Sequence, residues 1–283
     1  MTTRVERPTR PIEKAATTTH HPQTLARAIH AEWIKIRSLR STWIGMASIA
    51  AIMIGFGALA AGMTTGSVAA PQDGDGPFGA EGPLATVLTG ANFAVLLIGV
   101  LGSLAGAREY GSRMITATVA TVPRRWQVVI AKTVALAAVV TPTALIAVFG
   151  AYGAGMGILS ANDSATVALT DDGVVTSLLG MAGYLTAIAL LGLCLGILLR
   201  SVAGSIGTVV GGILILPNLA GALLPDSWDT ILKFLPSSAA ASFTEVMAAG
   251  DSTLSAGAGV AVLAAWVAAV TAAAILTIHR KDV

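Results

Sequence analysis

Long apolar runs separated by short polar segments dominate the chain, and this alternation is its most informative feature. Each run has about the 20 residues that a helix needs to cross the hydrocarbon core of a bilayer. We therefore predict an all-α, polytopic membrane protein with six transmembrane helices. The predicted spans cover residues 43–63, 84–107, 133–157, 174–199, 202–224 and 256–278.

Composition supports a bilayer as the solvent of this protein. Of its 283 residues, 54% are hydrophobic and only 11% are charged, whereas a soluble domain carries roughly 25% charged residues. So few charges cannot cover the surface of a folded chain in water. The single cysteine, Cys194, excludes an intramolecular disulfide. We interpret it as a small packing residue, because it lies inside an apolar run.

The polar N-terminal region divides into a tail and a helix. Residues 1–22 are rich in Thr, Arg and Pro, and we expect a disordered cytoplasmic tail. Residues 23–41 have helical periodicity, interrupted by Glu32 and Ile34. The apolar face holds Leu25, Ile29, Trp33, Ile36 and Leu39, and the opposite face holds Arg27, His30, Lys35 and Arg37. We predict an amphipathic cytoplasmic helix at the membrane interface; the alternative is a solvated helix that merely precedes the first span.

A basic segment, residues 108–132, separates the second and third apolar runs. We expect a short cytoplasmic helix over residues 112–122, which ends before Pro123 because proline does not continue a helix comfortably. Trp126 is expected at the membrane interface, and the Lys132 side chain is expected to extend towards it. A short helix held between two spans can transmit a push into the membrane. The alternative is a solvated loop.

The distribution of charge predicts the orientation. With six spans, all of the 17 Lys and Arg residues except Lys233 lie on the side of the termini, residues 108–132 and Arg200. Ten of the 15 acidic residues lie in the opposite loops: Asp73, Asp75, Glu81, Asp163, Asp171, Asp172, Asp226, Asp229, Glu245 and Asp251. The positive-inside rule then places both termini, including residues 279–283, in the cytoplasm of a multi-pass cell-membrane protein. An odd number of spans would mix the charges.

Motifs for energy conversion or catalysis are missing from the sequence. None of the five lysines follows a glycine, so there is no Walker A loop to hold ATP phosphates. The predicted spans carry no ionisable residue near their centres, which argues against a proton-driven carrier. No nucleophile, acid–base set or metal-ligand set is recognisable. We therefore expect that the chain is not an enzyme and binds no metal or cofactor.

Two kinds of residue within the spans allow more than one interpretation. The amides Asn92 and Asn218 either form interhelical hydrogen bonds or line a substrate path. Pairs of glycines four residues apart permit close helix packing, although a chain this rich in Gly and Ala contains such pairs by chance. These pairs are Gly102/Gly106, Gly153/Gly157, Gly192/Gly196 and Gly207/Gly211.

Three segments resemble permease subunits of ABC-2-type transporters, particularly actinobacterial ones. AEWIKIRSLRSTW (residues 31–43) is similar to the helix that leads into their first span. REYGSRMITATVATVPRRWQVVIAK (residues 108–132) is similar to the loop after their second span. LLPDSWDTILKFLPSSAAASF (residues 223–243) is similar to the external segment before their last span. The likeness covers most of the chain from about residue 25.

The resemblance implies a role for each part. Residues 24–41 would form the connecting helix, and residues 108–125 would contain a coupling helix that docks on a separate ATP-binding subunit. The coupling residues would be Arg108, Glu109, Tyr110, Arg113, Arg124 and Arg125. ATP and Mg would bind that partner subunit. The external segment would form short, partly re-entrant helices that cap the exit. Two permeases, as a homodimer or a heterodimer, would enclose the cargo path, which Asn92 and Asn218 are candidates to line.

The sequence thus favours the membrane-spanning permease of an ATP-driven exporter, with the lipid bilayer as its surroundings and no nucleic-acid partner. One alternative is a non-transporting membrane protein, such as a sensor partner, an immunity factor or a scaffold. A less favoured one is a carrier driven by an ion gradient. The cargo does not follow from the sequence.

Overall fold

The fold is known from a computed structural model, which describes residues 24–69, 82–111, 126–244 and 254–280. Every regular element in these ranges is helical, and no strand occurs in them. Five of the helices are long and apolar enough to cross a membrane. They are α2 (Arg40–Thr64), α4 (Ala91–Gly111), α6 (Trp126–Ala161), α7 (Val174–Leu199) and α12 (Ala256–Arg280). The prediction of an all-α membrane protein is therefore confirmed.

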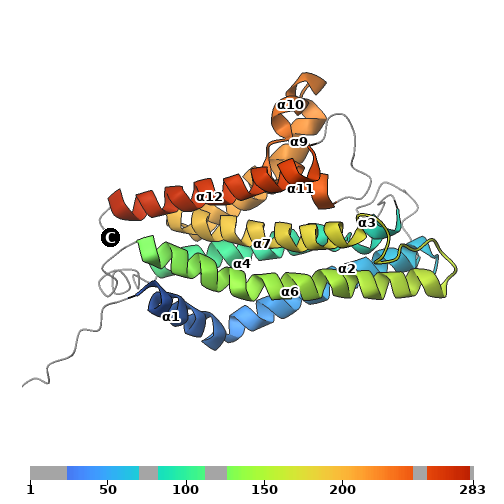
Figure 1. The fold of residues 1–283 in the computed structure, drawn as a ribbon, viewed down its shortest axis with the longest axis horizontal. Coiled ribbons are helices and arrows are strands. Elements are labelled where there is room, and N and C mark those ends of the chain that lie inside the picture. Colours follow the sequence, from blue (N-terminus) through green and yellow to red (C-terminus); the bar gives the residue numbers. More distant parts are fainter. Residues whose placement is uncertain (1–23, 70–81, 112–125, 245–253, 281–283) are drawn as a thin grey trace, which may run out of the picture.

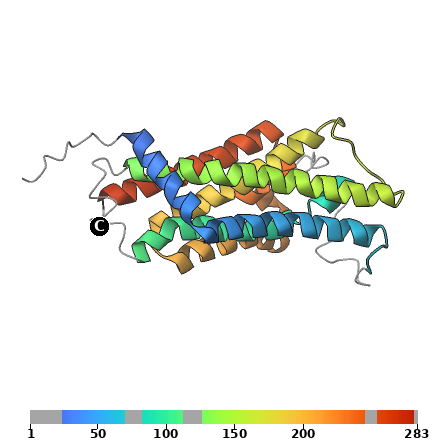
Figure 2. The same cartoon turned by 90° about the horizontal axis from the view of Figure 1, so that it is seen from below.

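The long helices run alongside one another in an elongated bundle (Figures 1 and 2). Helix α1 (Leu25–Ser38) and the end of α12 lie at one end, which we call the α1 end. The short helix α3 (Pro83–Val87) lies towards the other, which we call the α3 end. We compared the most apolar stretch of 18 residues in each long helix. In α7, 72% of this stretch is buried inside the bundle, but in α12 only 17% is buried. Helix α7 is therefore central, and α12 lies at the periphery.

The apolar run at residues 202–224 does not form a uniform helix. It consists of α8 (Val202–Gly207), the π-helix η1 (Thr208–Ile215) and α9 (Leu216–Leu223), with helical backbone at each junction. Leu216 N–H bonds to the carbonyl of Gly211, five residues earlier. The next residue, Pro217, has no N–H to bond four residues back, which favours a wider turn before it. A sixth membrane crossing through this run stays a prediction.

Other predicted boundaries also differ from those in the structure. The expected span at 84–107 begins instead with α3 and a turn, and α4 starts only at Ala91. The expected span at 133–157 is longer at both ends, because α6 covers Trp126–Ala161 and continues through Pro142. The predicted tail at 1–22 and the predicted helix at 112–122 lie outside the described residues. After α9 come three short helices: η2 (Asp226–Trp228), α10 (Asp229–Leu232) and α11 (Pro236–Thr244).

Glycines bring α4 and α7 into backbone contact. A Cβ atom placed on Gly102 would lie 2.1 Å from the carbonyl oxygen of Ala189, and one on Gly106 would lie 2.1 Å from that of Leu193. From the other side, a Cβ atom on Gly196 would lie 2.7 Å from the carbonyl oxygen of Ser103. By contrast, no described atom outside the glycine's own stretch of helix lies within 4 Å of such a Cβ at Gly153, Gly157, Gly207 or Gly211. Only two of the four glycine pairs therefore form this kind of interface within the chain.

A tyrosine fastens the segment between α6 and α7. The Tyr152 hydroxyl donates a hydrogen bond to the carbonyl of Val167, with 2.6 Å between the oxygens. Removal of one such bond costs about 1 kcal/mol. The substitution Tyr152→Phe should therefore speed hydrogen exchange of the peptide over residues 162–173 by about fivefold. Tyr184→Phe is the control, because no described residue forms a hydrogen bond with the Tyr184 hydroxyl. Unchanged exchange in Tyr152→Phe would show that other contacts hold this segment.

Candidate functional site

A cavity of about 590 Å³ lies among the helices on the α3 side of the bundle. Helices α4 and α7 form one part of its wall, and η1, α9, α10 and α11 form the rest. Its apolar lining includes Val95, Leu96, Met181, Leu214, Leu232 and Leu254. Its volume lies within the roughly 300–1,000 Å³ of small-molecule sites. The cavity is therefore large enough for an organic molecule of drug-like size.

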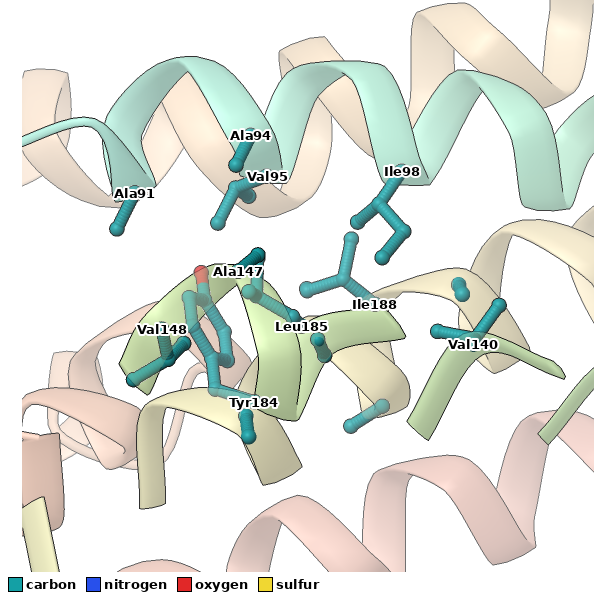
Figure 3. Packing of buried hydrophobic residues seen from close by; sticks show 14 of the residues in the cluster. Ala91, Ala94, Val95, Ile98, Val140, Ala147, Val148, Tyr184, Leu185 and Ile188 are labelled. Atoms are coloured by element: carbon teal, nitrogen blue, oxygen red, sulfur yellow. The ribbon is translucent and has the colours of Figure 1, made fainter. Parts of the chain in front are cut away.

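Three polar side chains in the cavity wall lack partners among the described residues. The Asn92 amide is exposed in the first turn of α4 and forms no side-chain hydrogen bond there. The Ser237 hydroxyl oxygen on α11 is buried and unpartnered. Tyr184 is 8% exposed, and its hydroxyl points towards α4, near Ala91 and Val95 (Figure 3). Because buried polar groups are normally hydrogen-bonded, the Ser237 and Tyr184 hydroxyls are placed to receive a bound molecule, and the exposed Asn92 amide is accessible to the same molecule.

Charged groups also line the cavity. Asp229 occupies the first turn of α10, and Lys233 caps the end of this helix. The Lys233 ammonium lies 5.6 Å from the ring centre of Phe234, a cation–π contact. The Phe234 carbonyl accepts a hydrogen bond from Trp266 Nε1 on α12, at 2.8 Å. This bond fixes the turn that carries Lys233 to a transmembrane helix.

The local sequence explains how these elements are placed. Gly90 lets the turn before α4 approach α2, since a Cβ atom there would lie 2.3 Å from the Met53 carbonyl oxygen. The turn at 88–90 therefore packs against α2, and Asn92 follows it at the start of α4. Pro236 occupies the first position of α11, where a missing N–H costs nothing. The next residue, Ser237, is thereby placed in the cavity wall.

The predicted path residues have different outcomes. Asn92 lines the cavity, and the structure describes no interhelical hydrogen bond of its amide. Asn218 belongs to α9, but its side chain is not among those described; its neighbour Pro217 lines the cavity. Sequence reasoning missed Tyr184, Asp229 and Lys233. One signal was available for Lys233, which is the only Lys or Arg between residues 201 and 279.

A buried charge cluster lies at the α1 end of the bundle. The Glu32 carboxylate on α1 accepts hydrogen bonds from two lysines. Lys132 Nζ on α6 lies 3.0 Å from its Oε2, and Lys35 Nζ lies 2.8 Å from its Oε1. Glu32 is 7% exposed and Lys132 is 5% exposed. The pair connects residues 100 positions apart and joins α1 to the first turns of α6.

One expectation about this region was wrong, and one stays a prediction. Lys132, whose extension towards the membrane interface stays a prediction, is buried against α1, because α6 begins at Trp126. Glu32 does not interrupt the packed face of α1 but lies at its centre. Trp33 and Ile36 pack against the bundle core beside it, whereas Leu39, expected on the same face, is 41% exposed. The packed face thus includes a carboxylate, because α6 supplies a lysine opposite it.

The start of α2 and the end of α4 lie at this same end. Trp43 Nε1 donates a hydrogen bond to the Arg37 carbonyl at 3.0 Å, which holds the bend between α1 and α2. Arg108 is exposed in the last turns of α4. The side chains of Glu109 and Tyr110 are not described, and Arg113, Arg124 and Arg125 lie outside the described residues. The structure therefore places only Arg108 of this predicted set.

Within the described ranges, no three His, Cys, Asp or Glu side chains gather in a way that could hold a metal ion. A comparison of the sequence with protein-family models finds no match, and a comparison with curated proteins finds none. The geometry of the cavity and of the charge cluster is therefore the basis for a functional proposal.

Proposed function

We propose that the chain is the membrane-spanning permease subunit of an exporter that a separate ATP-binding subunit drives. The observation that carries the proposal is the cavity, because polar groups of α4, α7 and α11 that no described residue hydrogen-bonds line a space among apolar helices. A purely structural membrane protein has no need to leave such groups without partners. A transported molecule that enters the cavity would form the missing hydrogen bonds.

The other end of the bundle supports a drive from outside the chain. The sequence has no Walker A loop, so ATP and Mg would bind the partner. Residues 108–125 are the proposed docking segment, and they directly precede α6. The ion pair of Glu32 and Lys132 joins α6 to α1, so a push on either element would move both. In this proposal six crossings place both termini in the cytoplasm, and a second permease completes the path.

Purification of the tagged full-length chain from its native membranes tests this proposal. We expect it to carry an ATPase subunit with a Walker A loop and vanadate-sensitive ATP hydrolysis. Arg113→Glu and Arg124→Glu should reduce the bound ATPase by about tenfold, because reversed charges repel a complementary surface. Asp163→Asn is the control, because it changes one charge in the segment between α6 and α7, towards the α3 end.

Two results would contradict the proposal. The first is a purified, correctly folded chain with no ATPase subunit and no ATP hydrolysis. The second is transport in membrane vesicles that a protonophore abolishes while the ATP concentration is held constant, which would indicate a carrier driven by an ion gradient. Arg113→Glu and Arg124→Glu variants that fold and keep their ATPase would refute the proposed docking segment.

A further inference from the structure

Two opposite charges on one helical turn line the cavity without pairing with each other. Asp229 and Lys233 are four residues apart, the spacing and order that favour an ion pair on a helix. Nevertheless, the described residues form no ion pair with either side chain, and the only interaction of the ammonium group is with the Phe234 ring. Both charges therefore remain available to a molecule in the cavity.

The rest of the lining is neutral and of two kinds. Asn92, Tyr184 and Ser237 offer hydrogen-bonding groups that no described residue occupies. Val95 and Leu214 belong to its apolar surface. A molecule that matches this wall needs a polar part that bears charge and an apolar part that excludes water. A ligand with a single charge would make only one of the two charged contacts that the wall offers.

We propose that the cavity binds a zwitterionic amphiphile of drug-like size. Its anionic group would lie at Lys233, its cationic group at Asp229 and its apolar body against the side chains of α4 and η1. The assignment of this molecule as exported cargo rests on the proposed function, whereas its binding does not. Trp266 donates a hydrogen bond to the Phe234 carbonyl, so the turn that carries Lys233 is held before the ligand arrives.

Short-chain probes that differ only in charge test the proposal. They are hexylphosphocholine, which is zwitterionic, hexyltrimethylammonium, which carries one positive charge, and hexyl methyl phosphate, a diester that carries one negative charge. The full-length chain is placed in nanodiscs of phosphatidylglycerol, which contain no phosphocholine lipid, and dissociation constants are measured by saturation-transfer NMR against empty nanodiscs. We expect the zwitterion to bind at least about fivefold more tightly than either singly charged probe, because each charged contact strengthens binding separately.

Substitutions separate the two charged contacts. Lys233→Gln should remove the preference of the zwitterion over hexyltrimethylammonium, and Asp229→Asn should remove its preference over hexyl methyl phosphate. Lys233→Arg keeps the positive charge, so it should keep the preference of the zwitterion over hexyltrimethylammonium. This result would show that a substitution at residue 233 leaves the turn folded. Asp163→Asn is a matched control, since Asp163 has a backbone φ of 53° that asparagine adopts readily, and it does not line the cavity.

Equal affinities of the three probes for the unaltered chain would overturn the proposal, and so would a zwitterion preference that survives both substitutions. The measurement needs no ATPase. A zwitterion preference in a chain that recruits no ATPase would therefore refute the proposed function and leave the binding site standing. ATP-driven export without a zwitterion preference would refute the binding site alone.

Discussion

Replacement of Gly102 by valine is expected to destabilise the folded bundle by about 3 kcal/mol, because overpacking at a backbone contact cannot be relieved by side-chain movement. A Cβ atom at this position would lie 2.1 Å from the carbonyl oxygen of Ala189 and 2.9 Å from its carbonyl carbon. Helices α4 and α7 would have to separate, and α7 is the most buried span. The midpoint of thermal unfolding in detergent and the monodisperse fraction after gel filtration measure the effect.

Gly153→Val is the matched control for this substitution. It adds the same side chain to a transmembrane helix that carries the same spacing of glycines, but no described atom outside that stretch of helix lies within 4 Å of the new Cβ. Its unfolding midpoint should stay close to that of the unaltered chain. If both variants were equally stable, the backbone contact between α4 and α7 would be refuted.

Replacement of Glu32 by leucine is expected to cost about 3 kcal/mol, because it leaves the buried Lys132 ammonium without its carboxylate. The double variant Glu32→Leu/Lys132→Met should recover most of this loss, since a buried ion pair is often replaced by apolar residues of similar volume without a net cost. Urea or thermal unfolding of the purified chain, followed by the tryptophan fluorescence, gives the difference in free energy.

Arg37→Gln is the control on the same helix, because the Arg37 side chain is exposed and its carbonyl, which binds Trp43, is unchanged. We expect it to alter the free energy of unfolding by no more than about 0.5 kcal/mol. A single Glu32→Leu variant as stable as Arg37→Gln would show that the charge cluster does not hold α1 to α6.

The long helices could be predicted from the sequence, because each contains one long apolar run. Such a run favours a membrane-spanning helix whichever helices pack beside it. Glu32 shows where this reasoning ends. From the sequence, the Glu32 charge interrupts the apolar face of its helix. The partner that permits its burial is Lys132, which lies 100 residues further along the chain. A pattern along one helix contains no information about a lysine on another. The same limit applies to the glycine pairs, of which only two face each other.

The candidate cavity was predictable only in part. Asn92 stood out because an amide is rare in an apolar run, and the structure places it in the wall. Tyr184 did not stand out, because a tyrosine within a span is ordinary until its neighbours are known. Lys233 was visible as the one basic residue among acidic loops. Its position on the cavity depends on the hydrogen bond between Trp266 and the Phe234 carbonyl, which only the fold reveals.

The π-helix η1 has a geometric consequence for the cavity. Its wide turns take up more residues than α-helical ones, and each residue of register corresponds to a rotation of about 100° about the helix axis. Return of η1 to regular α-geometry would turn α9 about its axis and carry Gly221 away from the cavity wall. Pro217 opposes that return, because in regular α-geometry its ring would crowd the carbonyl of Ile213, four residues earlier. The side of α9 that faces the cavity is thus set by one proline ring.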